Sequence, residues 1–189
     1  MTTVSIYADD GRGSPETLTD FGVIAARLGE VDVLMERWRL SAPLPAGASS
    51  EQVLAAYTAD IETLEERYGF ASVDVVAMTP DHPKRDEMRR KFLSEHTHAD
   101  FEVRFFVEGR GLFYLHIGGS VYVVLCTEGD LISVPADTTH WFDMGTSPSF
   151  RCIRFFTTPE GWVGEFTGSD IATRFPDFDT YVTQVAPGP

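Results

Sequence analysis

The sequence is poor in cysteine and lacks any long apolar run. Cys126 and Cys152 are too few for a disulfide framework, and their spacing is not that of a CxxC metal or redox motif. We expect both thiols to be buried or inert. No apolar stretch approaches the roughly 20 residues that a membrane-spanning helix needs, and residues 1–20 lack the basic and apolar regions of a signal peptide. These absences predict a cytoplasmic protein with no membrane partner.

Basic residues are also scarce, because 15 lysines and arginines stand against 29 acidic residues and leave a formal net charge of −14. Such a charge repels a phosphate backbone and offers no basic patch for nucleic acid. We therefore expect no nucleic-acid partner, and the acidity is typical of a solubility device. The acidity and the lack of an obvious apolar patch favour a monomer.

A single domain is expected over residues 1–189, since a chain of this length with 43% hydrophobic residues fits one ordinary core. The pattern of apolar and turn residues divides the chain into three parts: a helical N-terminal part, about 1–85, a β-barrel core, about 86–160, and a tail, 161–189, that packs on the outside. The early helices have too little core to stand alone, so the three parts are expected to fold together.

Two segments of the N-terminal part have apolar residues at helical spacing. In residues 17–30 these apolar residues follow a capping-type residue, Thr19 or Asp20. Residues 49–69 begin with two serines that can cap a helix and carry one apolar stripe that ends near Gly69. We predict a helix in each segment, then a strand in SVDVVAMTP, and a turn with a short helix in DHPKRDEMRRKF.

The barrel part consists of short β-type runs separated by turn dipeptides. The runs are FEVRFFV, GLFYLHI, VYVVLC, LISV and FRCIRFF, and the separators include EGRG, GG and EGD. Many short strands at this spacing indicate a closed barrel or a double-sheet jelly roll. Gly118-Gly119 is a hairpin signal between two of the runs.

One stretch of the barrel part, EHTHADFEVRFF, places ionisable residues in a run that is otherwise apolar. In a strand, residues two apart share a face, whereas in a helix they do not. The surrounding sequence favours a strand. His96, His98, Glu102 and Arg104 would then share one face, and the aromatic and aliphatic side chains between them would lie on the other.

The spacing within that stretch predicts a bend. On one straight strand, at about 3.3 Å per residue, His98 and Glu102 would lie roughly 13 Å apart, whereas ligands of one metal each lie about 2 Å from it. We therefore expect a bend at Ala99-Asp100 that lets the two segments converge. His140, after the turn PADTT, is a further candidate that a barrel could return to the same point.

Three imidazoles and one carboxylate form a nitrogen and oxygen donor set, unlike the thiolate-rich sites of structural zinc. Around a six-coordinate ion such a set leaves two positions open for catalysis or chelation. It suits ferrous iron, nickel, manganese or cobalt better than calcium or magnesium. The alternative interpretation is a surface strand with solvated histidines.

Two motifs carry a family resemblance. Residues 96–109, HTHADFEVRFFVEG, resemble the first cupin motif, and residues 129–140, GDLISVPADTTH, resemble the second. Over about 88–160 the chain further resembles the acireductone dioxygenases of methionine salvage. The resemblance implies a mainly β, α+β chain built on a cupin double-stranded β-helix, a jelly-roll barrel with flanking helices. Asp137 stands where the second motif has glycine, and aspartate tolerates a left-handed turn better than most residues.

The same resemblance implies one Fe(2+) or Ni(2+) per chain, with the ligands His96, His98, Glu102 and His140. It implies cleavage by O2 of the acireductone 1,2-dihydroxy-3-keto-5-methylthiopentene. With iron the products would be 4-methylthio-2-oxobutanoate and formate, and with nickel methylthiopropionate, formate and carbon monoxide. The ligand set does not decide between the ions, because affinity order and metal supply set occupancy.

Further residues are candidates for contact with such a substrate. Arg104 shares the ligand face, so its fixed charge could stabilise a substrate anion, and we expect it to be catalytic and substrate-binding. Phe92, Phe142 and Trp162 suit the methylthio tail, and Arg154 could line the cavity. Each has a structural alternative, which is an ion pair for an arginine and core packing for an aromatic ring.

Two other functions remain open from the sequence. One is a non-catalytic cupin that binds a metal or a small ligand. The other is a cupin isomerase for a sugar phosphate, which would need several basic residues where the motif region offers chiefly Arg104.

Overall fold

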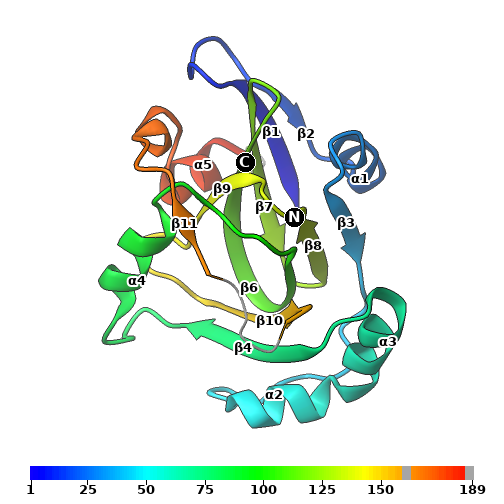
Figure 1. The fold of residues 1–189 in the computed structure, drawn as a ribbon. Helices are drawn as coiled ribbons and strands as arrows, with labels where there is room; N and C mark the ends of the chain where they lie inside the picture. Colours follow the sequence, from blue (N-terminus) through cyan, green and yellow to red (C-terminus); the bar gives the residue numbers. More distant parts are fainter. Residues whose placement is uncertain (159–162, 186–189) are drawn as a thin grey trace.

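The computed structural model describes residues 1–158 and 163–185, and in these residues the chain is mainly β-structure wrapped into a barrel (Figure 1). The strands are β1 (Thr3–Ala8), β2 (Glu16–Leu18), β3 (Leu34–Arg37), β4 (Ser72–Met78), β5 (His96–Thr97), β6 (Glu102–Ile117), β7 (Ser120–Thr127), β8 (Asp130–Val134), β9 (Thr139–Asp143), β10 (Phe150–Phe156) and β11 (Glu165–Phe166). The helices are α1 (Phe21–Gly29), α2 (Ser50–Ala56), α3 (Thr58–Tyr68), α4 (Arg85–Phe92), the 3-10 helix η1 (Ile171–Arg174) and α5 (Phe178–Val185). No helix in the described part of the chain is long and apolar enough to cross a membrane.

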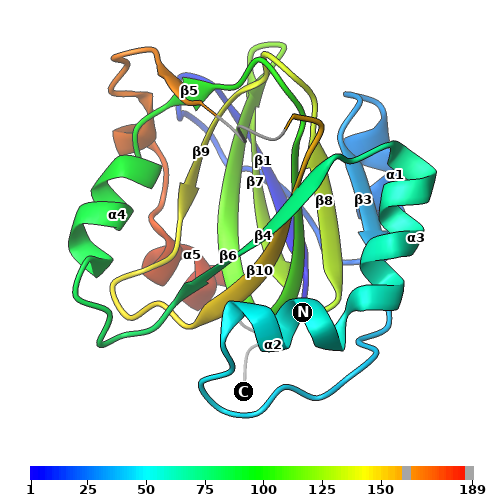
Figure 2. The same cartoon turned by 60° about the horizontal axis from the view of Figure 1, so that its bottom comes forward.

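Strand β6 holds the barrel together because it belongs to both of its sheets. Its first half pairs with β8 and β10, and its second half pairs with β7 and β9, all antiparallel. Figure 2 shows β6 near the middle of the barrel, with β9 on one side and β8 on the other. The β6–β7 hairpin turns through Gly118-Gly119, as predicted, since Ile117 faces Ser120.

The sequence predicts two strands separated by EGRG where the structure has the single 16-residue strand β6. The reason is a bulge: the register with β10 shifts between Arg151 and Cys152, so pairing continues while the strand bends. Gly109 makes the bend possible. Its φ is +70°, and a Cβ at this position would lie 1.9 Å from the carbonyl oxygen of Ser149.

The N-terminal part, predicted to be mainly helical, also supplies four strands to the barrel. β1 pairs with β7, β3 with β8 and β4 with β10, and only β4 was expected. The expected helix over 17–30 begins at Phe21, because Asp20 accepts a hydrogen bond from the Val23 amide at 3.0 Å and Glu16–Leu18 form β2. β2 and β3 are short, and β1 and β3 pair with distant segments, so local periodicity does not reveal these three strands.

The helix predicted over 49–69 is two helices, α2 and α3, that meet at Tyr57. Tyr57 has φ −108° and ψ 17°, which interrupts the helix. Its ring is buried against Phe105 with centroids 5.8 Å apart, and its hydroxyl donates to the Ala42 carbonyl at 3.1 Å. Packing of this one side chain therefore outweighs local helix propensity. The predicted end is confirmed, since Gly69 caps α3 in the left-handed conformation.

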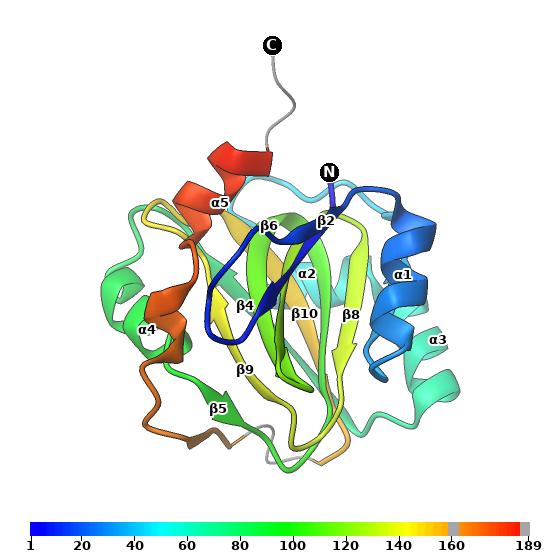
Figure 3. The ribbon, with the colours of Figure 1, turned by 90° about the horizontal axis from the view of Figure 1, so that it is seen from above.

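Three hydrophobic clusters fill the space between these elements. The first lies inside the barrel and includes Phe106 and the two cysteines, Cys126 and Cys152, which are fully buried as expected. The second lies under α2 and α3, and the third lies under η1 and α5. Figure 3 shows α1 and α3 on one side of the barrel and α4 on the other. Because successive β6 side chains point to opposite faces, Phe105 packs under the helices while Phe106 packs inside.

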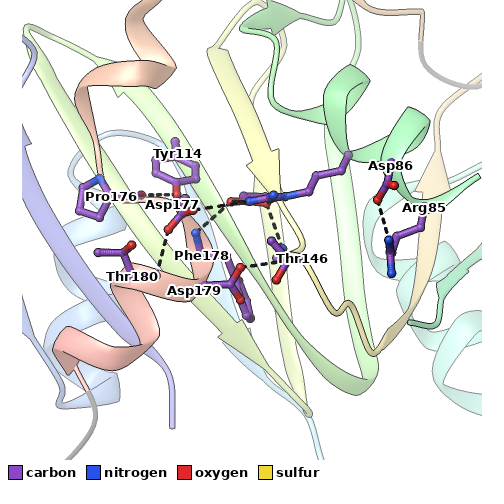
Figure 4. Close-up of polar contacts among 12 residues, drawn as sticks. Arg85, Asp86, Tyr114, Thr146, Pro176, Asp177, Phe178, Asp179 and Thr180 are labelled. Atoms are coloured by element: carbon purple, nitrogen blue, oxygen red, sulfur yellow. Dashed lines mark hydrogen bonds and ion pairs between the residues drawn. The ribbon is translucent and has the colours of Figure 1, made fainter. Parts of the chain in front are cut away.

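A buried carboxylate joins α4, β9 and α5. Asp143 at the end of β9 is fully buried, and its two oxygens accept bonds from Arg89 of α4 at 2.7 and 2.9 Å. The same oxygens accept from the backbone amides of Gly145 and Phe178, each at 2.9 Å. Figure 4 shows the surrounding contacts, in which Tyr114 donates to the Pro176 carbonyl at 2.6 Å. Asp143 thus fixes α4 relative to the strand that carries His140.

Candidate metal centre

Three strand segments bring the four predicted ligand residues together at one end of the barrel. His96 lies on β5 and faces His140 on the neighbouring strand β9 (Figure 3). His98 follows β5, and Glu102 begins β6 after the predicted bend, because residues 98–101 are not in a strand. Asp137 has φ +60° in the turn before β9, so the left-handed conformation expected there is confirmed.

The four side chains converge closely and are shielded from water. One potential ligand atom from each lies within 4.8 Å of those from the others. The exposed fractions are 8% for His96 and His98, 1% for Glu102 and 2% for His140. Glu102 Oε2 lies 2.9 Å from His98 Nε2 and 3.1 Å from His140 Nε2. The alternative of a solvated surface strand is therefore wrong.

Backbone carbonyls orient all three imidazole rings in the same way. The Nδ1 atom of His96 donates to Ser94 at 2.7 Å, that of His98 to Val163 at 2.9 Å, and that of His140 to Thr138 at 2.7 Å. A carbonyl oxygen can only accept, so each Nδ1 carries a proton, and a ring in its neutral form keeps the lone pair on Nε2. This fixed tautomer, with a buried carboxylate beside it, fits a bound divalent cation.

The charges of the cluster depend on its burial and on one arginine. Burial opposes ionisation of Glu102, but the charges of Arg104 and His140 and the bonds from the two nearest rings outweigh it and hold the pKa of this carboxyl well below its usual range. Burial and the neighbouring His140 lower the pKa of His96 to about 4. Burial also disfavours charge on His98, but its bond with Glu102 prevails and raises its pKa. The site therefore presents a carboxylate and, at His96, a neutral imidazole near pH 7.

Arg104 lies directly behind the carboxylate. Its Nε is 2.7 Å from Glu102 Oε1, and its side chain is only 5% exposed. The guanidinium lies over the ring of Phe142 at 4.6 Å and within 5.8 Å of the ring centre of Phe92. Such cation–π contacts stabilise a buried guanidinium. The sequence analysis gave two alternatives for Arg104, contact with the substrate and an ion pair. The structure shows the ion pair, and Arg104 also lines the cavity of the site.

A small cavity of about 100 Å³ opens beside the cluster. Phe92 and Arg154, both candidates from the sequence, line it together with two of the ligand histidines. Arg154 is also held by Asp74 of β4 through two bonds, at 2.7 and 2.5 Å. Phe142 is not among the described lining residues and is 1% exposed, so the structure places it behind the cavity wall. Trp162 lies outside the described residues.

Sequence reasoning missed three residues of this cavity: Lys91, Gly164 and Phe166. Phe166 lies on the two-residue strand β11, opposite His96, with ring centroids 5.6 Å apart. A Cβ on Gly164 would lie 3.6 Å from the rings of His96 and His98. The signal in the sequence was weak, since β11 is too short to show periodicity.

A larger hollow of about 640 Å³ lies between α4 and the segment of η1 and α5. Tyr114 and Trp141 form part of its wall, and none of the four ligand candidates reaches it. By volume alone, this hollow would be the candidate functional site. The smaller cavity is the better candidate, because the potential metal ligands and the histidine with a shifted pKa lie beside it.

Comparison with known proteins agrees with this geometry. Residues 3–164 match the model of the ARD/ARD' family. An acireductone dioxygenase of Methylococcus capsulatus is 53% identical over 98% of this chain and 100% of the relative, and one of Aquifex aeolicus is 56% identical over 96% and 99%.

The solved structure of acireductone dioxygenase from Bacillus anthracis, with a cadmium ion in its active center, superposes with a TM-score of 0.78. It is 30% identical to this chain and covers 88% of this chain and 98% of its own. The predicted fold class, a cupin barrel with flanking helices, is confirmed. The chain belongs to the ARD/ARD' family, in which the relatives named above are acireductone dioxygenases.

Proposed function

We propose that this protein cleaves the acireductone 1,2-dihydroxy-3-keto-5-methylthiopentene with O2 in methionine salvage. The observation that carries the proposal is the group of three imidazoles and one carboxylate, buried and within 4.8 Å of one another, beside a buried arginine. Relatives more than half identical over nearly the whole chain are named acireductone dioxygenases. This likeness does not favour a non-catalytic cupin that binds a metal or a small ligand, or a sugar-phosphate isomerase.

We infer that one Fe(2+) or Ni(2+) ion is bound by His96, His98, Glu102 and His140. The nitrogen and oxygen donors and the inward Nε2 atoms suit these ions. An ion held by these four residues would supply Lewis-acid chemistry that stabilises negative charge on the oxygens of the substrate. The iron form would yield 4-methylthio-2-oxobutanoate and formate, and the nickel form methylthiopropionate, formate and carbon monoxide.

The chain's own residues supply charge, position and shielding. Arg104 keeps Glu102 ionised, and its positive charge lines the cavity where a substrate anion would lie. Phe92 and Phe166 offer apolar surface to the methylthio tail. Phe142 contributes indirectly by carrying the guanidinium of Arg104. Arg154, whose own charge is balanced by Asp74, closes the cavity wall.

Reconstitution with a single metal tests this function. The protein is stripped with a chelator, loaded separately with Fe(2+) and Ni(2+), and given acireductone in air. Products are identified by mass spectrometry and carbon monoxide detection. We expect 4-methylthio-2-oxobutanoate and formate from the Fe(2+) preparation. Carbon monoxide is expected only from the Ni(2+) preparation. If both preparations leave the acireductone intact while the metal is bound, the proposal is wrong.

We further propose that the chain acts as a single-domain monomer in the cytoplasm. The net charge of −14 opposes self-association. Light scattering at several protein concentrations tests the monomer: a mass of one chain is expected, and a stable dimer would contradict it.

A further inference from the structure

We propose that Lys91 recruits the acireductone as an anion and positions it in the cavity beside the metal centre. This inference rests on the function proposed above. Lys91 lies in the last turn of α4, is exposed to solvent, and lines the cavity together with His96 and His98. It is therefore a cation at the mouth of the site that an incoming molecule can meet in water.

The cavity differs in charge from the rest of the molecule. The chain has nearly twice as many acidic as basic residues, 29 against 15, so its overall field repels anions. Among the described lining residues, however, three are cationic, Lys91, Arg104 and Arg154, and none is acidic. A local positive field of this kind attracts a small anion to one place on an otherwise repelling surface.

Lys91 differs from the two arginines because no acid in the described part of the chain holds it. Arg104 Nε lies 2.7 Å from Glu102, and Arg154 is bound by both oxygens of Asp74. Among the residues that the structure describes, Lys91 forms no ion pair and no hydrogen bond through its side chain. The arginine charges are therefore partly balanced by the protein, whereas the charge of Lys91 is available to a ligand.

The chemistry of the substrate fits this cation. An enediol conjugated to a ketone is a vinylogous acid, so the acireductone loses a proton readily and reaches the protein as an anion. An ammonium on a flexible four-carbon stem presents three donors and can follow an oxygen anion from solvent into the cavity. Lys91 would act on binding and orientation, while the bond-breaking steps depend on the groups deeper in the site.

The chain contains only two lysines, Lys84 just before α4 and Lys91 in its last turn, which gives a matched control. Lys84 is exposed at the start of α4 and does not line the cavity. The variants Lys91→Met, Lys91→Arg and Lys84→Met are loaded with the same metal as the wild type. Initial rates of acireductone loss in air are measured over a range of substrate concentrations at low and high ionic strength.

We expect Lys91→Met to lower kcat/KM roughly five- to tenfold at low ionic strength, mainly through KM, and to weaken its dependence on salt. Lys91→Arg should keep most of the wild-type value, and Lys84→Met should match the wild type. A Lys91→Met enzyme within twofold of the wild type, or an equal loss in Lys84→Met, would overturn the inference alone. A wild type that leaves acireductone intact would overturn the proposed function and the inference with it.

Chemical labelling gives an independent readout. Trinitrobenzenesulfonate modifies both lysines, and peptide mass spectrometry reports each one separately. Under argon, where O2 cannot consume the substrate, acireductone should slow the labelling of Lys91 in the metal-loaded protein and leave that of Lys84 unchanged. Equal labelling of Lys91 with and without acireductone would contradict direct contact.

Discussion

The buried carboxylate Asp143 offers a sharp test of how the barrel positions its site. It accepts four hydrogen bonds, two from Arg89 and one each from the amides of Gly145 and Phe178. We consider Asp143→Asn, which keeps the shape of the side chain, removes its charge and replaces one acceptor oxygen by an NH2 group. Each carboxylate oxygen accepts from one Arg89 nitrogen and one backbone amide, so the substitution removes one bond of each kind, whichever oxygen is replaced.

The expected loss follows from these contacts. A hydrogen bond to a charged group contributes about 1.5–3 kcal/mol and an ordinary one about 1 kcal/mol. Arg89 is 19% exposed, so water can solvate part of the guanidinium that loses its partner. We therefore expect the free energy of unfolding to fall by about 3 kcal/mol, a large share of the roughly 5–15 kcal/mol typical of a domain.

The assay is urea unfolding of metal-free wild type and variants, since bound metal would add its own stabilisation. Asp177→Asn is the matched control. Asp177 lies 3.8 Å from the same arginine and is 49% exposed. It accepts a hydrogen bond from the Thr180 amide of α5 at 2.9 Å, and asparagine fills such a capping role as well as aspartate does. The control should lose less than about 1 kcal/mol. If Asp143→Asn also lost less than that, Asp143 would not be the junction that fixes α4.

Two further predictions concern the fold. Gly109→Ala should lower the free energy of unfolding in urea by about 2–4 kcal/mol, because φ is +70° and the new Cβ would lie 1.9 Å from the Ser149 oxygen. Gly13→Ala is the control, since Gly13 has φ +82° but open space around it, and its loss should be clearly smaller. Equal losses would refute the steric argument. Burial raises the pKa of the Cys126 and Cys152 thiols above the usual 9.0. The folded state therefore keeps protons that the unfolded chain releases, so stability should fall above pH 9 by about 1.4 kcal/mol per pH unit for each thiol. Unfolding of the double alanine variant from pH 8 to 10 should show a correspondingly shallower decline, and an unchanged slope would exclude the thiols as its source.

The ligand group could be predicted because strand geometry and metal geometry constrain each other. Side chains two apart share a face, yet His98 and Glu102 are too far apart on a straight strand, so the bend at Ala99-Asp100 follows. The structure has that bend and brings His140 in from β9. Local signals of this kind also located the glycine hairpin and the cap of α1.

What the sequence did not reveal depends on contacts between distant segments. The strand β1 pairs with β7 across more than half of the chain, and the residue pattern of β1 does not indicate that partner. The break between α2 and α3 at Tyr57 arises from packing against Phe105, and helix propensity does not predict it. Lys91 and Phe166 reach the cavity only because α4 and β11 fold back over it. Tertiary packing therefore decided these features.

The central claim is that three imidazoles and one carboxylate bind a single metal ion inside the barrel. Its most direct test is the metal content of purified protein after loading with Ni(2+) and removal of free ion. We predict one nickel per chain in the wild type and in His82→Ala, whose histidine lies outside the cluster, and less than a tenth as much in His140→Ala or Glu102→Ala. A His140→Ala protein that is folded and still retains one nickel per chain would contradict the account.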